Sequence, residues 1–248
     1  MKWRIIVLDT YDACMNMAID EAVMEGVREH KSPPTIRFYR WSPSAVSIGR
    51  FQSMNDEVNT EKCKELGIDY IRRITGGGAV YHDNKGEITY SIIAPESAFP
   101  SGIRESYKVI CDWIIIGLAK LNIKASFAPI NDILVGTRKI SGNAQTRDRG
   151  ILLQHGTVLY DLDLKTMFSV LNVSKEKISD KMIKSAEERV TKVLDYSNAS
   201  LAELYSALLY GFTLNKDYEV GKLTEDELKR AAYLAKSIYK THGWNFSR

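Results

Sequence analysis

RRITGGGAVYHD, residues 72–83, places three consecutive glycines after two arginines and just before a tyrosine and a histidine. Glycine inside an ordered domain costs backbone entropy, and it is used where the chain needs a positive φ or where a ligand must approach bare N–H groups. The stretch is neither a Walker A loop nor a G-x-G-x-x-G fingerprint. On spacing alone a hairpin turn is the simpler interpretation, and a site for an anion carried on an apolar body is the alternative.

Working outward from the glycines, short strand-like segments alternate with turns, and helices gather toward the C-terminus. The predicted strands are residues 4–8, 35–39, 45–48, 68–73, 79–82, 87–93, 127–130, 132–135, 138–142 and 152–160. The predicted helices are residues 16–24, 56–66, 106–122, 164–171, 175–184, 199–213 and 224–241, the last opened by a capping box at Thr224. Glycine turns between strands favour antiparallel neighbours. We therefore predict one α/β (α+β) domain over residues 1–248, with a helical portion from about residue 164.

The composition is that of an ordinary soluble protein, with 44% hydrophobic and 26% charged residues. A net charge of +3 without basic runs argues against nucleic acid as a partner. No segment is apolar and long enough to predict a membrane span or a signal peptide, so we expect a cytoplasmic protein. Three cysteines without C-x-x-C spacing predict neither a disulfide framework nor a zinc site.

Few polar residues stand out before any family is considered. Lys139 follows a turn in a strand-like segment, where it is either a solvent-facing lysine or a fixed cation for developing phosphate charge. Arg73 allows the same two interpretations, and its planar fork suits a phosphate. His82 and His155 lie beside glycine-bearing turns, where hydrogen-bonding histidines are a simpler interpretation than metal ligands. Adjacent Asp20 and Glu21 point to different helix azimuths, and we predict a solvated or capping face for them.

Several motifs, in one order along the whole chain, resemble the lipoate–protein ligase family. The glycine stretch resembles the family's lipoate-binding loop. The other matching segments are residues 15–22 (MNMAIDEA), 46–52 (VSIGRFQ), 131–133 (NDI), 138–144 (RKISGNA), 155–157 (HGT), 188–191 (ERVT) and 244–246 (WNF).

The resemblance implies a mixed, largely antiparallel sheet flanked by helices, a fold shared with biotin protein ligases. It implies ATP-dependent attachment of lipoate, through lipoyl-AMP, to a lysine of a lipoyl domain. The implied acceptors are 2-oxoacid dehydrogenase E2 subunits or glycine cleavage H protein. ATP and Mg²⁺ are then co-substrate and ion, lipoate is the substrate, and no tightly bound cofactor is expected.

The resemblance also assigns roles to residues. Lys139 is the expected catalytic residue, which stabilises charge on phosphorus and later on the acyl carbonyl. The expected ATP and lipoyl-AMP contacts are Arg73, Gly78, Ala79, Val80, Tyr81, Asn131, Asp132 and Lys139. The expected lipoate contacts are Thr75, Gly76, Gly77, Gly78, His82, Lys139, His155 and Gly156. Asp132 is the candidate Mg²⁺ ligand.

The sequence departs from the family pattern in two respects. The cysteine-dependent acyltransferases of the family need a thiol, and Cys14, Cys63 and Cys111 all lie outside the segments around Lys139 and residues 143–156. This favours adenylate chemistry over a thioester route from an octanoyl or lipoyl carrier, and transfer from lipoyl-AMP stays an alternative. The chain also ends where many ligases continue into an accessory domain, so we expect a separate accessory polypeptide. A noncatalytic module that binds lipoate or its carrier is the remaining alternative, and Lys139 argues against it.

Overall fold

A computed structural model of the chain describes residues 1–172 and 188–248. Its strands are β1 (Trp3–Tyr11), β2 (Thr35–Trp41), β3 (Ala45–Ile48), β4 (Asp69–Arg72), β5 (Val80–His82), β6 (Glu87–Pro95), β7 (Ala125–Ala128), β8 (Asp132–Val135), β9 (Arg138–Asp148), β10 (Ile151–Leu159) and β11 (Tyr218–Gly221). Its α-helices are α1 (Ala13–Arg28), α2 (Met54–Glu57), α3 (Thr60–Leu66), α4 (Ile103–Lys120), α5 (Leu164–Val170), α7 (Leu201–Thr213), α8 (Glu225–Leu234) and α9 (His242–Asn245).

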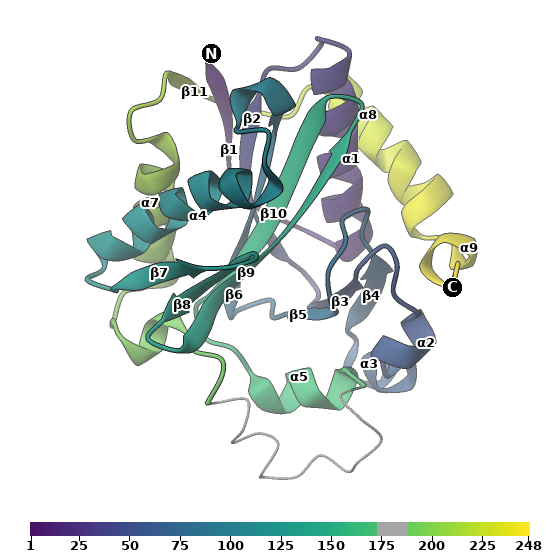
Figure 1. The fold of residues 1–248 in the computed structure, drawn as a ribbon. Coiled ribbons are helices and arrows are strands. Elements are labelled where there is room, and N and C mark those ends of the chain that lie inside the picture. The colour runs from purple at the N-terminus through teal and green to yellow at the C-terminus, as the bar shows by residue number, and fades with distance from the viewer. Residues whose placement is uncertain (173–187) are drawn as a thin grey trace.

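The strands form one large sheet and one small sheet (Figure 1). The large sheet has the order β11-β1-β2-β6-β10-β9-β8-β7, and only its pairs β11–β1 and β1–β2 are parallel. The predicted mixed, largely antiparallel sheet with flanking helices is therefore confirmed. No helix of the described residues is long and apolar enough to cross a lipid bilayer.

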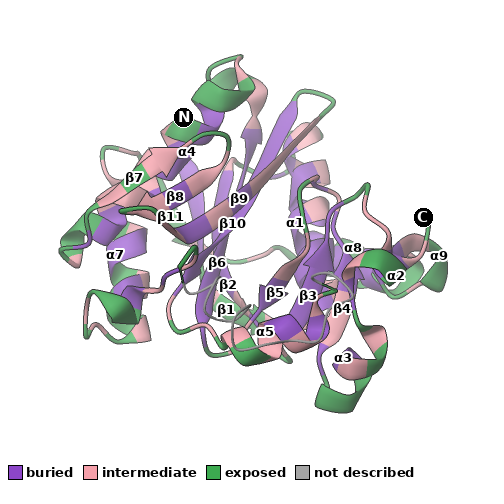
Figure 2. Ribbon diagram, turned by 60° about the horizontal axis from the view of Figure 1, so that its bottom comes forward, coloured by how far each residue is buried: buried purple, intermediate pink, exposed green. Residues whose placement is uncertain are grey.

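Helices cover both faces of the large sheet, because its central strands bury side chains on both sides. On β6, Tyr90 and Ile92 face the core beneath α4 and α7, while Ile93 faces the core beneath α1 and α8. Figure 2 shows the central strands as the most continuously buried part of the molecule. The sheet therefore holds in place the side chains at its lower end, as oriented in Figure 1.

The small sheet has the order β4-β3-β5, with β3 parallel to β4 and antiparallel to β5. The strands that enter and leave the glycine turn therefore do not pair with each other, so the hairpin interpretation of residues 72–83 is wrong. The turn instead carries the chain across the end of β3. This crossing requires a wide loop rather than a tight two-residue connection.

The C-terminal part is less purely helical than predicted. β11 pairs in parallel with β1, and the expected single helix over residues 224–241 ends at Leu234, followed by a π-helical turn and by α9. The capping box at Thr224 is present. The helix predicted over residues 175–184 lies outside the described residues. Near α9, the indole N–H of Trp244 donates to the carbonyl of Arg72, and the side chain of Asn245 accepts from the N–H of Arg72.

Candidate functional site

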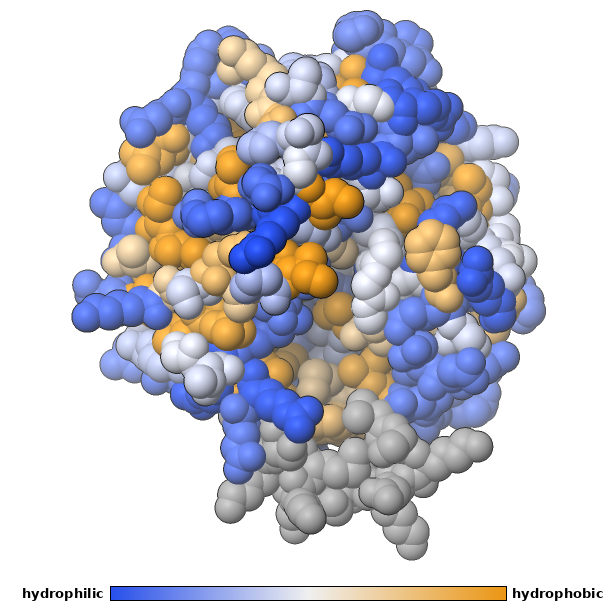
Figure 3. Space-filling model, viewed as in Figure 1, coloured by the Kyte–Doolittle hydropathy of each residue, from blue (hydrophilic) through white to orange (hydrophobic). Residues whose placement is uncertain are grey.

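A cavity of about 300 Å³ opens where the lower end of the large sheet meets the small sheet and α5. In the space-filling view, apolar atoms gather around the hollow at the centre of this face (Figure 3). The apolar lining includes Met17, Tyr39, Trp41, Leu159, Leu162, Met167 and Leu171. The polar lining includes Ser47, Arg73, His82, Thr89, Asn131, Lys139, Asn143, His155 and Thr157. Such a site suits an apolar chain with one polar reactive end.

The cavity brings most of the predicted site residues together from distant segments. The predicted residues on its wall are Arg73, Gly77, Gly78, Ala79, Val80, Tyr81, His82, Asn131, Lys139, His155 and Gly156. Thr75, Gly76 and Asp132 are not among the lining residues. The contacts that each residue makes with a ligand remain predictions.

Arg73 holds the glycine turn in place from inside. Its Nη2 donates to the carbonyls of Gly76 at 2.8 Å and Gly78 at 2.7 Å, and its Nη1 donates to the carbonyl of Ser47 at 3.0 Å. Gly77 has a φ of 96°, a conformation that favours glycine. The bidentate grip on phosphate predicted for Arg73 would require it to release these carbonyls.

A second glycine packs against the turn from outside. A Cβ on Gly49 would lie 2.1 Å from the carbonyl oxygen of Gly77, so no larger residue fits there. The N–H of Arg50 donates to the carbonyl of Thr75 at 2.9 Å. The turn is therefore clamped on both sides rather than free.

Lys139 lies near the start of β9, where its N–H donates to the carbonyl of Arg189 at 2.7 Å. Its ammonium forms an ion pair with Asp132 at 2.7 Å, and its side chain is 39% exposed. A Cβ on Gly142 would lie 2.7 Å from Nζ, so the amine rests directly over this glycine. Lys139 is thus a positioned cation at the cavity wall, as the catalytic prediction requires.

Asp132 does not stand in a cluster of metal-ligating side chains among the described residues. Within residues 1–172 and 188–248, no cluster of three or more His, Cys, Asp and Glu side chains could hold a metal ion. The Asp132 carboxylate instead pairs with Lys139. The Mg²⁺ role of Asp132 stays a prediction, because Mg²⁺ is often held by only one or two carboxylates together with substrate phosphates.

Asn143, which the sequence did not single out as a site residue, links several residues of the cavity wall. Its amide accepts from the hydroxyl of Tyr90 at 2.6 Å and donates to the carbonyl of Asn131 at 2.7 Å. The same Nδ2 lies 3.5 Å from the sulfur of Cys111. A Cβ on Gly156 would lie 2.1 Å from Asn143 Oδ1, so Gly156 makes room for this brace.

None of the three cysteines lines the cavity, although Cys111 is separated from it only by Asn143. Burial raises the pKa of the Cys111 thiol to about 12 and that of Cys14 and of Cys63 to about 11. A thiol must ionise to act as a nucleophile. The three thiols are therefore unsuited to covalent catalysis at this site.

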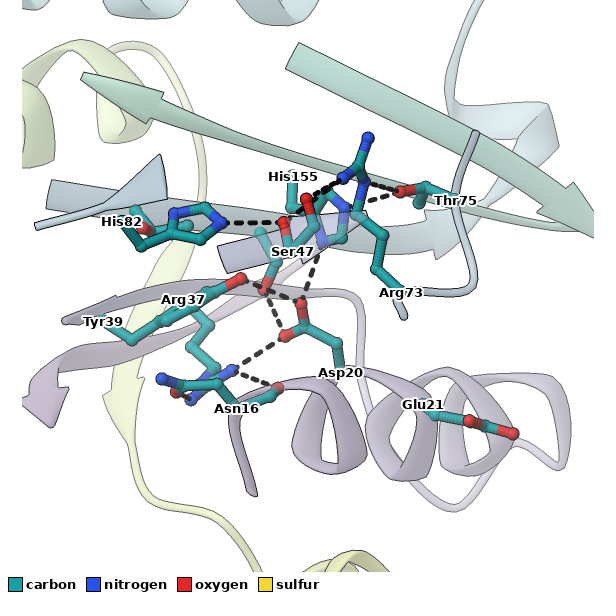
Figure 4. A network of polar contacts seen from close by, with 12 residues as sticks. Asn16, Asp20, Glu21, Arg37, Tyr39, Ser47, Arg73, Thr75, His82 and His155 are labelled. Atoms are coloured by element: carbon teal, nitrogen blue, oxygen red, sulfur yellow. Dashed lines mark hydrogen bonds and ion pairs between the residues drawn. The ribbon is translucent and has the colours of Figure 1, made fainter. Parts of the chain in front are cut away.

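Two chains of hydrogen bonds link buried carboxylates to Arg73 (Figure 4). In the Glu87 relay, Glu87 Oε1 lies 2.7 Å from His82 Nδ1, His82 Nε2 lies 2.8 Å from Ser47 Oγ, and Ser47 Oγ accepts from Arg73 at 3.2 Å.

In the Asp20 relay, Asp20 Oδ2 lies 3.4 Å from His155 Nδ1, His155 Nε2 lies 2.8 Å from Thr75 Oγ1, and Thr75 Oγ1 accepts from Arg73 Nε at 3.1 Å. Although burial alone raises the pKa of Asp20, the hydrogen bond from His155 and the charge of Arg37 bring it below its ordinary value. Burial lowers the pKa of His155 despite the nearby carboxylate. The two pKa shifts therefore favour an ionised Asp20 carboxylate beside a neutral His155 imidazole.

The prediction of a solvated or capping face is wrong for Asp20. This residue is 1% exposed, and Asp12 is the N-cap of α1. It forms an ion pair with Arg37 at 2.9 Å and accepts from Ser91 at 2.8 Å. A signal was present in the sequence: Arg37 stands inside a buried strand, where a cation requires a carboxylate partner. Glu87 and Ser47 had no comparable signal.

Comparison with known proteins gives consistent results. Residues 12–213 match the family described as the lipoyl protein ligase A/B catalytic domain. The chain is 34% identical to octanoyltransferase LipM of Brevibacillus brevis, over 100% of this chain and 99% of that protein. It is 32% identical to octanoyltransferase LipM of Bacillus subtilis, over 99% and 98%.

Two solved structures share the fold over nearly their whole length. A bi-partite lipoate protein ligase of Thermoplasma acidophilum, described with its E2 lipoyl domain, has a TM-score of 0.89 and 32% identity, covering 99% of this chain and 96% of that chain. A lipoate-protein ligase A bound with ATP has a TM-score of 0.85 and 30% identity, covering 99% of both chains.

The full-length relatives correct the principal functional prediction. They are octanoyltransferases, so the prediction of an ATP-dependent ligase that acts through lipoyl-AMP is wrong, and the acyltransferase alternative fits better. The absence of a cysteine near Lys139 does not decide for adenylate chemistry. A fixed cation also stabilises the negative charge that develops on the carbonyl oxygen during acyl transfer. The fold, the cavity and the match over residues 12–213 agree on one point: this chain belongs to the lipoyl protein ligase A/B catalytic-domain family.

Proposed function

We propose that this protein transfers an octanoyl group, or a related lipoyl group, from a carrier thioester to a lysine of a lipoyl-domain protein. The observation that carries the proposal is the position of Lys139, an ammonium held over Gly142 at the wall of a mainly apolar cavity. The family supports a lipoate-related acyl group as substrate and a lipoyl domain as protein substrate. E2 subunits and glycine cleavage H protein are the acceptors we propose.

The reaction is an aminolysis of a thioester. The neutral amine of the acceptor lysine attacks the acyl carbonyl carbon, the C–N bond forms, and the C–S bond breaks. The carrier leaves as a thiol after the amine has lost one proton. Negative charge develops on the carbonyl oxygen during attack, and the ammonium of Lys139 stabilises that charge.

We propose that the acyl group passes directly from the carrier to the acceptor, without an acyl-cysteine intermediate. Cys111 contacts Asn143 of the cavity wall, yet it does not line the cavity, and its burial raises the pKa of its thiol to about 12. A direct transfer requires that carrier and acceptor approach the site together.

The proposed transfer has no step for ATP or Mg²⁺, because the acyl group arrives already activated as a thioester. It also assigns no step to the accessory polypeptide predicted from the sequence, since that prediction was tied to adenylate formation. The acceptor domain is the only protein that the chemistry requires besides the carrier.

The test incubates the purified chain with octanoyl-loaded acyl carrier protein and an unmodified lipoyl domain. Intact-mass spectrometry and peptide mapping should find one octanoyl group on the lipoyl lysine. A lipoyl domain with that lysine replaced by arginine should remain unmodified. An unmodified wild-type domain after long incubation with active carrier would refute the proposal.

A further inference from the structure

Arg73 is a buried cation whose hydrogen bonds all go to neutral oxygens. It is 4% exposed, and its side chain donates five hydrogen bonds within the described part of the chain, to Ser47, Thr75, Gly76 and Gly78 and to no carboxylate. Burying an ion without a partner is costly, so a fold normally supplies an opposite charge nearby. Here the Glu87 relay and the Asp20 relay, as defined above, bring opposite charges to Arg73 indirectly.

One set of directions satisfies every donor and acceptor that the Glu87 relay joins. An arginine side chain can only donate, and an ionised carboxylate can only accept. In this set Ser47 Oγ accepts from Arg73 and donates its proton to His82 Nε2, while His82 Nδ1–H donates to Glu87. This arrangement requires His82 to be neutral, with its proton on Nδ1.

The same reasoning applies to the Asp20 relay. Arg73 Nε donates to Thr75, Thr75 donates to His155 Nε2, and His155 Nδ1–H donates to Asp20. The two relays enter Arg73 at different nitrogens, Nη1 and Nε. The remaining nitrogen, Nη2, is then directed at the carbonyls of Gly76 and Gly78.

We propose that Glu87 and Asp20 are positioning residues for the acyl site. Each acts through a histidine and a hydroxyl to orient Arg73, and Arg73 in turn fixes the glycine turn whose residues 77 and 78 line the cavity. Neither carboxylate belongs to the cavity wall, and each is 1% exposed.

The surroundings of Glu87 support a specific role rather than ordinary packing. Its Oε1 also accepts from Thr89, whereas its Oε2 has no hydrogen-bond partner among the described residues. The protein contacts of Glu87 are therefore concentrated on Oε1, the oxygen that bonds to His82. Trp41 stacks on the His82 ring at 4.0 Å and 16°, which fixes the plane in which His82 can bond to Glu87 and Ser47.

Glu87→Gln is the better test variant of the two carboxylates. Asp20 also pairs with buried Arg37 at 2.9 Å, so its replacement would leave a second cation uncompensated and endanger folding. Glu21→Gln is the matched control. Glu21 neighbours Asp20 on α1, accepts from Tyr239, and points away from the relays in Figure 4.

The first experiment is independent of catalysis and uses ¹⁵N NMR of the histidine rings and of the Arg73 Nε–H. Wild-type protein at pH 7.5 should show His82 and His155 as neutral Nδ1–H tautomers. Glu87→Gln should introduce the Nε2–H form of His82 and shift Arg73 while His155 stays unchanged, and Glu21→Gln should leave all three signals in place. A wild-type His82 protonated on Nε2, or unchanged His82 and Arg73 signals in Glu87→Gln, would overturn the proposal.

The second experiment rests on the proposed function and measures kcat/KM for octanoyl transfer. Glu87→Gln and Ser47→Ala should each lower kcat/KM at least about tenfold, and their double variant should lie within about twofold of Ser47→Ala because both break one relay. Losses that multiply in this double variant would mean general destabilisation and contradict the relay. If wild-type protein transfers no octanoyl group, the proposed function fails, while the NMR result still decides the role of Glu87.

Discussion

Replacing Gly142 by alanine displaces the proposed catalytic amine without removing it. A Cβ at this position lies 2.6 Å from Cε and 2.7 Å from Nζ of Lys139, whereas ordinary contacts begin at 3.4 Å. The end of the lysine must therefore retreat by about 0.7 Å. A misplacement of about 1 Å at a reacting group can cost about 100-fold in rate. We expect kcat/KM for octanoyl transfer to fall about 10- to 100-fold.

The same change should hardly affect folding, because the displaced atoms are the flexible end of a side chain. Losing the half-exposed ion pair with Asp132 costs at most about 1 kcal/mol. For a chain of this size, such a loss lowers Tm by about 2–4 °C. Gly243→Ala is the matched control, since a Cβ there meets nothing within 4 Å. If Gly142→Ala keeps kcat/KM within threefold of wild type, the placement of Lys139 over this glycine has no part in catalysis.

Three further predictions concern the site and its buried charges. Lys139→Met should lower kcat by about 100- to 1,000-fold through loss of an oxyanion stabiliser. Arg138→Met, at the neighbouring position outside the main cavity, should keep kcat within threefold of wild type. Equal losses in the two variants would contradict the catalytic role of Lys139. Cys111→Ala should retain transfer within threefold in the same assay, whereas abolished transfer together with a hydroxylamine-labile acyl-enzyme in wild type would refute direct transfer. The free energy of unfolding should fall as pH drops below 6.5 and again near 3.8, because the folded chain holds the pKa of His155 and of Asp20 below these ordinary values and the unfolded chain binds protons first. Denaturant titrations at pH 7.5 and 5 should show a smaller decrease for His155→Gln, and identical decreases would contradict this origin.

The parts of the site that depend on local chemistry could be predicted from the sequence. The residue types allow a ligand site at the glycine turn and at Lys139, the family resemblance assigns that role to them, and the cavity includes Gly77, Gly78 and Lys139. The position of Gly142 under the amine had no such signal. It depends on how far β9 advances past β8, and that register is irregular next to Lys139.

The buried carboxylates could not be predicted for a different reason. A carboxylate on a helix or strand is solvated unless tertiary partners remove it from water, and those partners come from distant segments. Asp20 meets Arg37 and His155, which lie 17 and 135 residues away. Likewise, β11 has mostly exposed side chains and forms a strand only because the edge of β1 is available.

A side-by-side comparison of two acyl donors tests the central claim, that the acyl group comes from a carrier thioester. The purified chain and an unmodified lipoyl domain are given either octanoyl-loaded acyl carrier protein or octanoate with ATP and Mg²⁺, and initial rates of lysine octanoylation are measured by mass spectrometry. Transfer from a carrier thioester predicts rapid modification with the loaded carrier, and no faster modification when ATP and Mg²⁺ are added. Modification that occurs only with octanoate, ATP and Mg²⁺ would contradict it.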